Sequence, residues 1–382
     1  MPRRCELTRA LRPLSLCLAL VAGSSLEASA SGPRAPDDGG FPQALANSLQ
    51  AAVDQWAESP THRGVSAAVL LKSGQEWIGV AGVEADGKAL GPEHLIWIAS
   101  ITKTMTGAVI MSLAEEELLD LEDPVGKWLG ELPNIDPEIT IRQLLNHTNG
   151  LANYTKNPDL QAAIDADGAH VFTSDELVAL VGPASFARGE RTQYTNTAFV
   201  LLGMIGAKAG GRPITELWTE RLWAPLGLEQ IFLPGYQEPP GPVATSWYGP
   251  RSDAEVAPLE HMALLTMGNG AFGLFSNADT VARWAHELFN GGAFGEAMGS
   301  EMLQFVPAAG NIRGESGAGL GIRKYDYLGR EQWGHSGGSP LGTSLVIHDE
   351  QTGITVAVLM NQGSNADHFT LAPRLLEIAQ GD

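Results

Sequence analysis

Strand-like segments lie near both ends of this 382-residue chain, and helix-like segments fill the middle. Residues 64–71 and 76–83 are apolar or β-branched and flank a short polar turn, which is the pattern of an antiparallel hairpin. Residues 341–349 and 353–361 form a second pair of this kind near the C-terminus, and residues 319–327 and 330–335 before them also look like strands. Strands at both ends with helices between them predict one antiparallel sheet that is assembled from the two ends of the chain.

Helical spacing dominates from residue 100 to about residue 228, and one of the predicted helices, residues 174–181, has Ser174 as its expected N-cap. We therefore predict an α/β (α+β) fold, in which an antiparallel sheet is flanked by helices and joined to a mainly helical lobe. The sheet domain is expected to be discontinuous, with residues 41–99 and 275–382, and the helical domain to span residues 100–274. A proline-rich loop at residues 231–258 belongs to the helical part, and we expect the site in the crevice between the two parts.

The N-terminal segment has the features of a secretory signal peptide. Four arginines precede an apolar run at residues 14–22, and a small-residue cleavage site ends at Ala30. Residues 1–30 are therefore predicted to be removed, and residues 31–40 to form a flexible leader. A periplasmic or extracellular location follows. Because both cysteines lie in this segment, no disulfide or thiolate metal site is expected in the mature protein.

The formal charge of −20 comes from 44 acidic and 24 basic residues. Such acidity argues against nucleic acid or an anionic membrane surface as a partner. No other stretch is long and apolar enough to span a membrane. We expect a small-molecule or peptide substrate instead, and neither a cofactor nor a metal.

The first candidate for chemistry is the pair Ser100 and Lys103. The three-residue spacing places both side chains on one face at the start of an apolar helix pattern, residues 105–119. Burial disfavours the charged form of a lysine, so Lys103 can accept a proton from a nucleophilic serine. The motif is weak by itself, and an exposed helix start with a solvated lysine is the alternative.

A second candidate lies in residues 189–197, a turn that enters a long apolar helix. Neighbouring cations would lower the pKa of Tyr194, which could then accept the serine proton or relay it to a leaving group. Asn196 offers a donor and an acceptor to an amide or ester substrate. The alternative is a structural tyrosine followed by an asparagine that caps the helix.

The third candidate is the segment 333–339, at the end of a predicted strand. His335 would face the pocket as a polar or cationic catalytic group that can steer a carboxylate or a proton, and the backbone N–H groups of Gly338 and Ser100 could form an oxyanion hole. The segment also matches G-x-S-x-G, the nucleophile elbow, with Ser336 as the serine. That motif needs a helix after the turn, whereas Pro340 and another strand follow here, so the elbow is disfavoured.

Together these motifs resemble those of the serine β-lactamase and penicillin-recognising DD-peptidase superfamily, which are S-x-x-K, Y-x-N and K-T-G or H-T-G in this order. Here they read Ser100-Ile101-Thr102-Lys103, Tyr194-Thr195-Asn196 and His335-Ser336-Gly337. The connecting segments 121–125, 143–151 and 273–276 also resemble the class C-like branch.

The resemblance implies a role for each candidate residue. Ser100 would be the acylated nucleophile, Lys103 its proton acceptor and Tyr194 the general base or relay. Substrate would contact Asn196, Ser336 and Gly338, whereas His147 would be a structural turn residue. Class C β-lactamases have a lysine in the place of His335, and histidine there is similar to DD-carboxypeptidases and D-amino-acid-specific peptidases.

The sequence therefore predicts a secreted serine hydrolase that works through an acyl-enzyme on Ser100, of the D-Ala-D-Ala carboxypeptidase or D-amino-acid peptidase type. An esterase or weak β-lactamase of the same fold is one alternative. A non-catalytic sensor that binds penicillin or peptidoglycan is another, although a sensor has no need of Ser100, Lys103 and Tyr194 together.

Overall fold

The structure is a computed structural model that describes residues 40–85, 87–249, 255–308, 310, 312–363 and 367–381. The predicted signal peptide and all but the last residue of the predicted leader lie outside the described residues. So does the middle of the proline-rich loop, residues 250–254.

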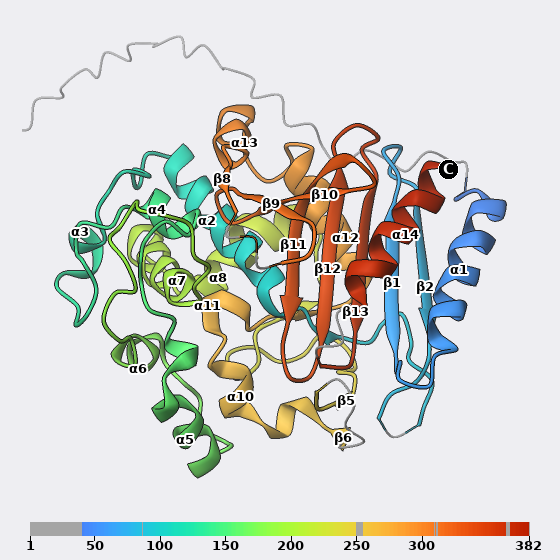
Figure 1. The fold of residues 1–382 in the computed structure, drawn as a ribbon, viewed down its shortest axis with the longest axis horizontal. Helices are drawn as coiled ribbons and strands as arrows, with labels where there is room; N and C mark the ends of the chain where they lie inside the picture. Colours follow the sequence, from blue (N-terminus) through green and yellow to red (C-terminus); the bar gives the residue numbers. More distant parts are fainter. Residues whose placement is uncertain are drawn as a thin grey trace, which may run out of the picture. The chain divides into compact units, whose positions relative to one another are not determined.

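The helices and strands follow one another along the chain in the order shown by the colours of Figure 1. The α-helices are α1 (Gln43–Ala57), α2 (Thr102–Glu115), α3 (Val125–Leu129), α4 (Ile141–Leu145), α5 (Pro158–Ala166), α6 (Ser174–Ala179), α7 (Thr197–Gly210), α8 (Ile214–Trp218), α9 (Ala224–Leu226), α10 (Met262–Thr266), α11 (Asn269–Phe272), α12 (Ala278–Phe289), α13 (Glu296–Met302) and α14 (His368–Gln380). The strands are β1 (Val65–Leu70), β2 (Glu76–Ala81), β3 (Ile96–Trp97), β4 (Ile231–Phe232), β5 (Ser246–Trp247), β6 (Glu255–Val256), β7 (Phe275–Ser276), β8 (Val306–Pro307), β9 (Glu315–Ala318), β10 (Arg323–Tyr327), β11 (Arg330–Gly338), β12 (Thr343–Asp349) and β13 (Thr355–Met360).

The main sheet has eight strands in the order β2-β1-β13-β12-β11-β10-β9-β8, and every neighbouring pair is antiparallel. The two ends of the chain meet within it, next to the β2 edge, where Val65 of β1 lies opposite Met360 of β13. The predicted fold class, with an antiparallel sheet, flanking helices and a mainly helical lobe, is confirmed.

Helices cover both faces of this sheet (Figure 1). The helices α1 and α14 lie on one face, where Leu49, Val53 and Leu375 join a buried apolar cluster with strand residues. The helix α12 packs against the other face, over β1, β12 and β13. A larger cluster on that side continues into α2 and α7. Burial of apolar area on both faces is the main stabilising contribution to such a layered structure.

Local hydrogen bonds explain where several elements begin. The side chain of Thr140 accepts a hydrogen bond from the N–H of Gln143, and the Gln143 side chain accepts one from the N–H of Thr140. The helix α4 therefore begins with a capping box. The helix α6 begins in the same way at Thr173, although Ser174 looked like the cap in the sequence. Thr173 takes the role because Glu176 lies three residues after it.

The C-terminal strands differ from the predicted ones at one edge. Residues 319–327 were expected to form a single strand, but β10 begins only at Arg323. Gly321 has a φ of 85°, and the turn around it separates β10 from β9. The short strands β8 and β9 then complete the edge of the sheet.

The helix α2 lies at the junction of the sheet and the helical part, and its residues from Thr102 to Leu113 are all buried. It packs against α7, α11 and the turn around Gly321. A Cβ at Gly107 would come within 3.2 Å of the Gly321 Cα, so this packing needs a glycine on the helix. This contact holds α2 against the turn between β9 and β10.

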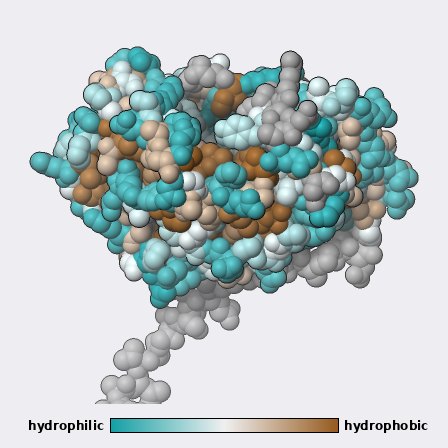
Figure 2. All heavy atoms as spheres, turned by 90° about the horizontal axis from the view of Figure 1, so that it is seen from below, coloured by the Kyte–Doolittle hydropathy of each residue, from teal (hydrophilic) through white to brown (hydrophobic). Residues whose placement is uncertain are grey.

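The molecular surface is mainly hydrophilic on the face shown in Figure 2, with apolar residues in a band across its middle. No helix within the described ranges has the length and apolar character needed to cross a bilayer.

Candidate active site

Ser100 lies in a single 3₁₀ turn, Ala99–Ile101, that leads into α2. The preceding Ala99 has a φ of 47°, a left-handed conformation that is unfavourable for a residue with a Cβ. The turn is held by Thr102, whose hydroxyl donates to the Ala99 carbonyl (2.7 Å) and accepts from the Leu274 N–H (3.1 Å). Surrounding structure therefore fixes the position of the Ser100 side chain.

Strand β11 packs directly against this turn. The Ser344 hydroxyl of the neighbouring β12 donates to the Ile98 carbonyl (2.8 Å). A Cβ at Gly337 would lie 2.4 Å from the same carbonyl oxygen and 2.2 Å from Ser344 Oγ. The glycine of the third motif thus has a steric cause. Strand β11 can lie this close to the Ala99–Ile101 turn only without a side chain at residue 337.

The Lys103 side chain is completely buried one helical turn after Ser100. Its Nζ lies 3.3 Å from Ser100 Oγ and donates to Asn196 Oδ1 (2.8 Å) and to the Ala271 carbonyl (2.7 Å). Burial, and then the positive charge of Arg323, lower the Lys103 pKa well below its usual value. A neutral amine has two hydrogens, which these two acceptors satisfy, so its lone pair remains for Ser100.

The Tyr194 hydroxyl donates to Ser100 Oγ at 2.7 Å. The Lys103 Nζ and the Arg323 guanidinium carbon lie 4.7 and 4.6 Å from the centroid of its ring. The sequence prediction that these cations lower the pKa of Tyr194 is wrong in its net direction. Burial raises the pKa and outweighs the charge of Arg323 and the hydrogen bond to Ser100. Tyr194 is therefore a protonated donor in the resting site rather than a phenolate.

The ring of His147 packs against the ring of Tyr194. Its φ is 62°, and its carbonyl accepts a hydrogen bond from the Gln193 N–H at 2.9 Å. Its ring lies against Tyr194, with 4.6 Å between the ring centroids, and against Phe199. Burial, and then the charges of Arg323 and Lys103, lower its pKa, which favours the neutral imidazole. These contacts agree with a structural turn residue that positions the tyrosine.

Asn196 lies directly before α7 but makes no side-chain capping bond there. Its Oδ1 accepts from Lys103 instead. The arrangement differs from the helix-cap alternative, and it leaves the amide NH₂ group of Asn196 as the donor that a substrate carbonyl can use.

Arg323 is the main site residue that the sequence motifs did not reveal. Its side chain, 4% exposed, forms a buried ion pair with the carboxylate of Glu315. Its Nε donates to His335 Nε2 (3.4 Å). Arg323 shares one face of β10 with the buried Tyr325 and Tyr327, so a lone charge on an otherwise aromatic face was the available signal.

His335 is held in one tautomer by its two neighbours. Its Nδ1 lies 2.6 Å from the Ser336 carbonyl and so carries the hydrogen, because Nε2 is the acceptor for Arg323. Burial lowers the pKa of His335, and the charges of Arg323 and Lys103 lower it further, so the neutral form is favoured over the cation.

The other two predicted substrate contacts lie nearby on β11. Ser336 is buried and faces Tyr325, whose pKa burial raises in spite of this contact. Gly338, the last residue of β11, is exposed, and a Cβ there would meet nothing within 4 Å. The backbone of Gly338 therefore borders open space at the end of the strand.

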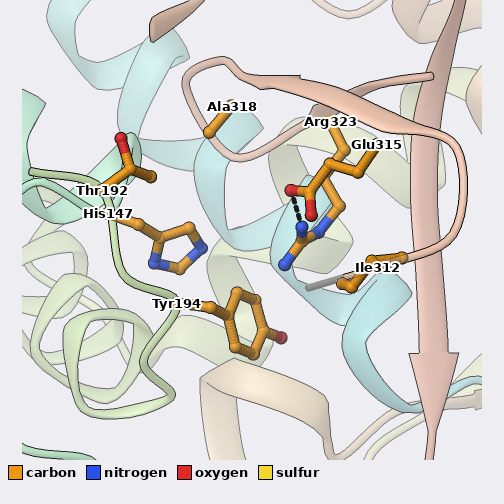
Figure 3. Close-up of a pocket in the computed structure, with 7 residues that line it drawn as sticks. All are labelled: His147, Thr192, Tyr194, Ile312, Glu315, Ala318 and Arg323. Carbon is orange, nitrogen blue, oxygen red and sulfur yellow. Dashed lines mark hydrogen bonds and ion pairs between the residues drawn. The ribbon is translucent and has the colours of Figure 1, made fainter. Parts of the chain in front are cut away.

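The side chains that surround Tyr194 line a pocket, formed by His147, Thr192, Tyr194, Ile312, Glu315, Ala318 and Arg323 (Figure 3). A wider groove adjoins it at Thr192 and runs between residues 189–193 and residues 306–308. The pocket and the groove both lie on the side of the edge strands β8 and β9.

Residues 49–380 match the family described as Beta-lactamase. The chain belongs to this family. The predicted resemblance to serine β-lactamases and penicillin-recognising DD-peptidases is therefore confirmed.

Named relatives include enzymes with several activities. Penicillin-binding protein 4* of Bacillus subtilis is 31% identical over 148 residues, which are 37% of this chain and 31% of that protein. Esterase EstB of Burkholderia gladioli is 28% identical over 239 residues, 54% of this chain and 59% of that protein. The matches to these two curated relatives thus span less than two thirds of their length. Among solved structures, a D-stereospecific amidohydrolase from Streptomyces sp. has a TM-score of 0.75 and 28% identity, covering 86% of this chain and 98% of that one.

Proposed function

We propose that this protein is a serine hydrolase that forms an acyl-enzyme on Ser100 and cleaves amide bonds made by D-amino acids, in peptides of the D-Ala-D-Ala type or in D-amino-acid amides. The contacts at Ser100 Oγ carry the proposal, because the Tyr194 hydroxyl and Lys103 Nζ both lie within hydrogen-bond reach of it. The name of the Streptomyces amidohydrolase supports the D-stereospecific substrate class.

Each catalytic group has a role that its environment suits. Ser100 Oγ attacks the carbonyl carbon and passes its proton to the neutral Lys103. The C–N bond breaks as the Tyr194 phenol gives its proton to the leaving nitrogen, and the proton on Lys103 restores the phenol. Water then attacks the ester carbonyl, and the same groups move protons in the opposite direction to release the acid.

The surrounding groups would bind and orient the substrate. The NH₂ group of Asn196 would donate to the acyl-side amide, because its oxygen is already held by Lys103. The backbone N–H groups of Ser100 and Gly338 would stabilise the oxyanion, and Ser336 remains a proposed contact. We also propose a periplasmic or extracellular location with a peptide or small-molecule substrate, on the strength of residues 1–30.

The first experiment asks whether Ser100 is the nucleophile. Wild-type protein and a Ser100→Ala variant are each incubated with a fluorescent penicillin and with a fluorophosphonate, and the intact mass is measured. We expect one adduct on the wild type and none on the variant. No adduct with either probe would contradict nucleophilic catalysis and favour a non-catalytic sensor. An adduct that is lost in Ser336→Ala but kept in Ser100→Ala would instead identify Ser336 as the nucleophile.

The second experiment tests the substrate class with matched enantiomers. Hydrolysis of D- and L-phenylalanine amide is followed by ammonia release, beside a simple p-nitrophenyl ester. The proposal predicts hydrolysis of the D-amide and little of the L-amide. Ester turnover without hydrolysis of either amide would favour an esterase instead, the activity that the name of EstB records for that protein.

A further inference from the structure

The pocket beside Tyr194 contains a carboxylate of the protein itself. Glu315 of β9 forms a buried ion pair with Arg323 of β10, and each side chain is 4% exposed. Both residues line the pocket, and Figure 3 shows the Glu315 carboxylate turned towards the guanidinium group. Because Tyr194 would protonate the leaving nitrogen, this pocket lies where the leaving group of the substrate would be bound.

The pair leaves this part of the site without a net positive charge. The other basic groups near Tyr194 are Lys103, His147 and His335, and burial favours the neutral form of each. The remaining charges among the described residues that line the pocket are those of Arg323 and Glu315, which cancel. A second carboxylate in the pocket would lie beside a like charge.

One donor of Arg323 is buried beside the Tyr194 ring. Its Nη1 binds Glu315 and its Nε binds His335, whereas the buried Nη2 has no hydrogen-bond partner within the described part of the chain. In Figure 3 the free end of the guanidinium group points towards the space between His147 and Tyr194. A neutral leaving group would meet no such repulsion from Glu315, whereas a carboxylate would.

We propose that Glu315 determines leaving-group specificity, because it occupies the position against Arg323 that a substrate carboxylate would otherwise take. The enzyme then favours leaving groups that end in a neutral group, such as a carboxamide, over leaving groups with a free carboxylate. This inference rests on the proposed function, and within it disfavours a strict carboxypeptidase.

Two substrates that share one scissile bond test the inference. They are N-acetyl-D-Ala-D-Ala and N-acetyl-D-Ala-D-alaninamide, which differ only in the charge at the C-terminus. For the wild type we expect kcat/KM for the amide to exceed that for the acid by about tenfold or more, the scale of a close like-charge contact. Glu315→Gln should shift this ratio by at least about tenfold towards the acid.

Glu331→Gln is the matched control. Glu331 lies on the adjacent strand β11 and pairs at 3.3 Å with Lys324 at the surface, so the same chemical change should leave the ratio as in the wild type. Glu315→Gln removes one partner of a buried ion pair and lowers stability. Because both substrates are measured on the same preparation, a smaller folded fraction cancels from the ratio.

Binding to the Ser100→Ala protein separates failure of this inference from failure of the proposed function. Dissociation constants of both compounds are measured by calorimetry with and without Glu315→Gln. If the wild type hydrolyses neither compound, the proposed function is wrong for this substrate class. Tighter binding of the amide, reversed by Glu315→Gln, would still support the role of Glu315. The role of Glu315 would be overturned if the wild type prefers the acid, or if the amide and the acid bind equally or not at all. It would also be overturned if Glu315→Gln leaves the amide-to-acid ratio unchanged.

Discussion

Replacing Gly337 by alanine should damage the site without removing any functional group. A Cβ there would lie 2.4 Å from the Ile98 carbonyl oxygen, 2.2 Å from Ser344 Oγ and 3.1 Å from Ala99 Cβ. Ordinary contacts of a Cβ begin near 3.4 Å, so strand β11 and the Ala99–Ile101 turn must separate by about 1 Å. The φ of Gly337 is outside the left-handed region, so these contacts are the cause rather than backbone strain.

A displacement of this size at a reacting atom costs about 100-fold in rate, or about 2.7 kcal/mol of transition-state stabilisation. Overpacking should also lower the free energy of unfolding by about 1–3 kcal/mol. We expect Gly337→Ala to react with fluorophosphonate about 100-fold more slowly than the wild type. Thermal unfolding of the same samples measures the loss of stability separately.

Gly299→Ala is the control, because Gly299 lies in α13 and a Cβ there would meet nothing within 4 Å. It should label at the wild-type rate. The steric explanation fails if Gly337→Ala also labels at that rate while its mass and its melting curve show that the variant is present and folded.

Three other predictions follow from the contacts and pKa shifts. Tyr194→Phe removes the hydrogen bond to Ser100 Oγ and should lower kcat/KM for amides by about 10²–10⁴-fold while the melting temperature changes little; an unchanged kcat/KM would exclude Tyr194 as the proton donor. Lys103 must be neutral to accept a proton, so activity should fall as the pH drops through its lowered pKa, and the permanently charged Lys103→Arg should be inactive across the pH range in an ester assay. Burial, and then the charge of His286, lower the pKa of His348 from 6.5 to about 4. Folding therefore favours the neutral imidazole, and the resulting stabilisation, up to about 3 kcal/mol, is complete above pH 6.5 and is lost as the pH falls towards 4. Urea unfolding at several pH values should show a smaller pH dependence for His348→Asn, and an unchanged slope would contradict the assignment.

Contacts between residues that are close in the sequence were predictable. Ser100 and Lys103 share a helical turn, so the three-residue spacing alone placed Nζ near Oγ. The hairpin of β1 and β2 follows from apolar runs around a polar turn. Even here the details depend on competition between neighbours, since Thr173 rather than Ser174 caps α6.

Long-range electrostatics were not predictable from sequence patterns. The ion pair of Arg323 and Glu315 depends on a turn at residues 319–322, which the sequence predicted as the start of a strand. The net direction of the Tyr194 pKa shift depends on the depth of burial, which no local pattern reports, and burial outweighs the nearby cation. Family motifs identify which residues meet, whereas the protonation state of each one is a property of the assembled site.

The pairing of β1 with β13 sets a condition on how the protein is made. Val65 and Met360 are partners, so the ribosome must synthesise nearly the whole chain before the N-terminal hairpin can join the sheet. Closing such a loop is entropically unfavourable and slow compared with forming a helix or a hairpin. Strand β12 lies between β11 and β13, and its Ser344 hydroxyl donates a hydrogen bond to the Ile98 carbonyl beside Ser100. A nascent chain therefore stays catalytically silent until its last strand has emerged, and a product truncated before β13 should be both inactive and prone to aggregate at its unpaired edges.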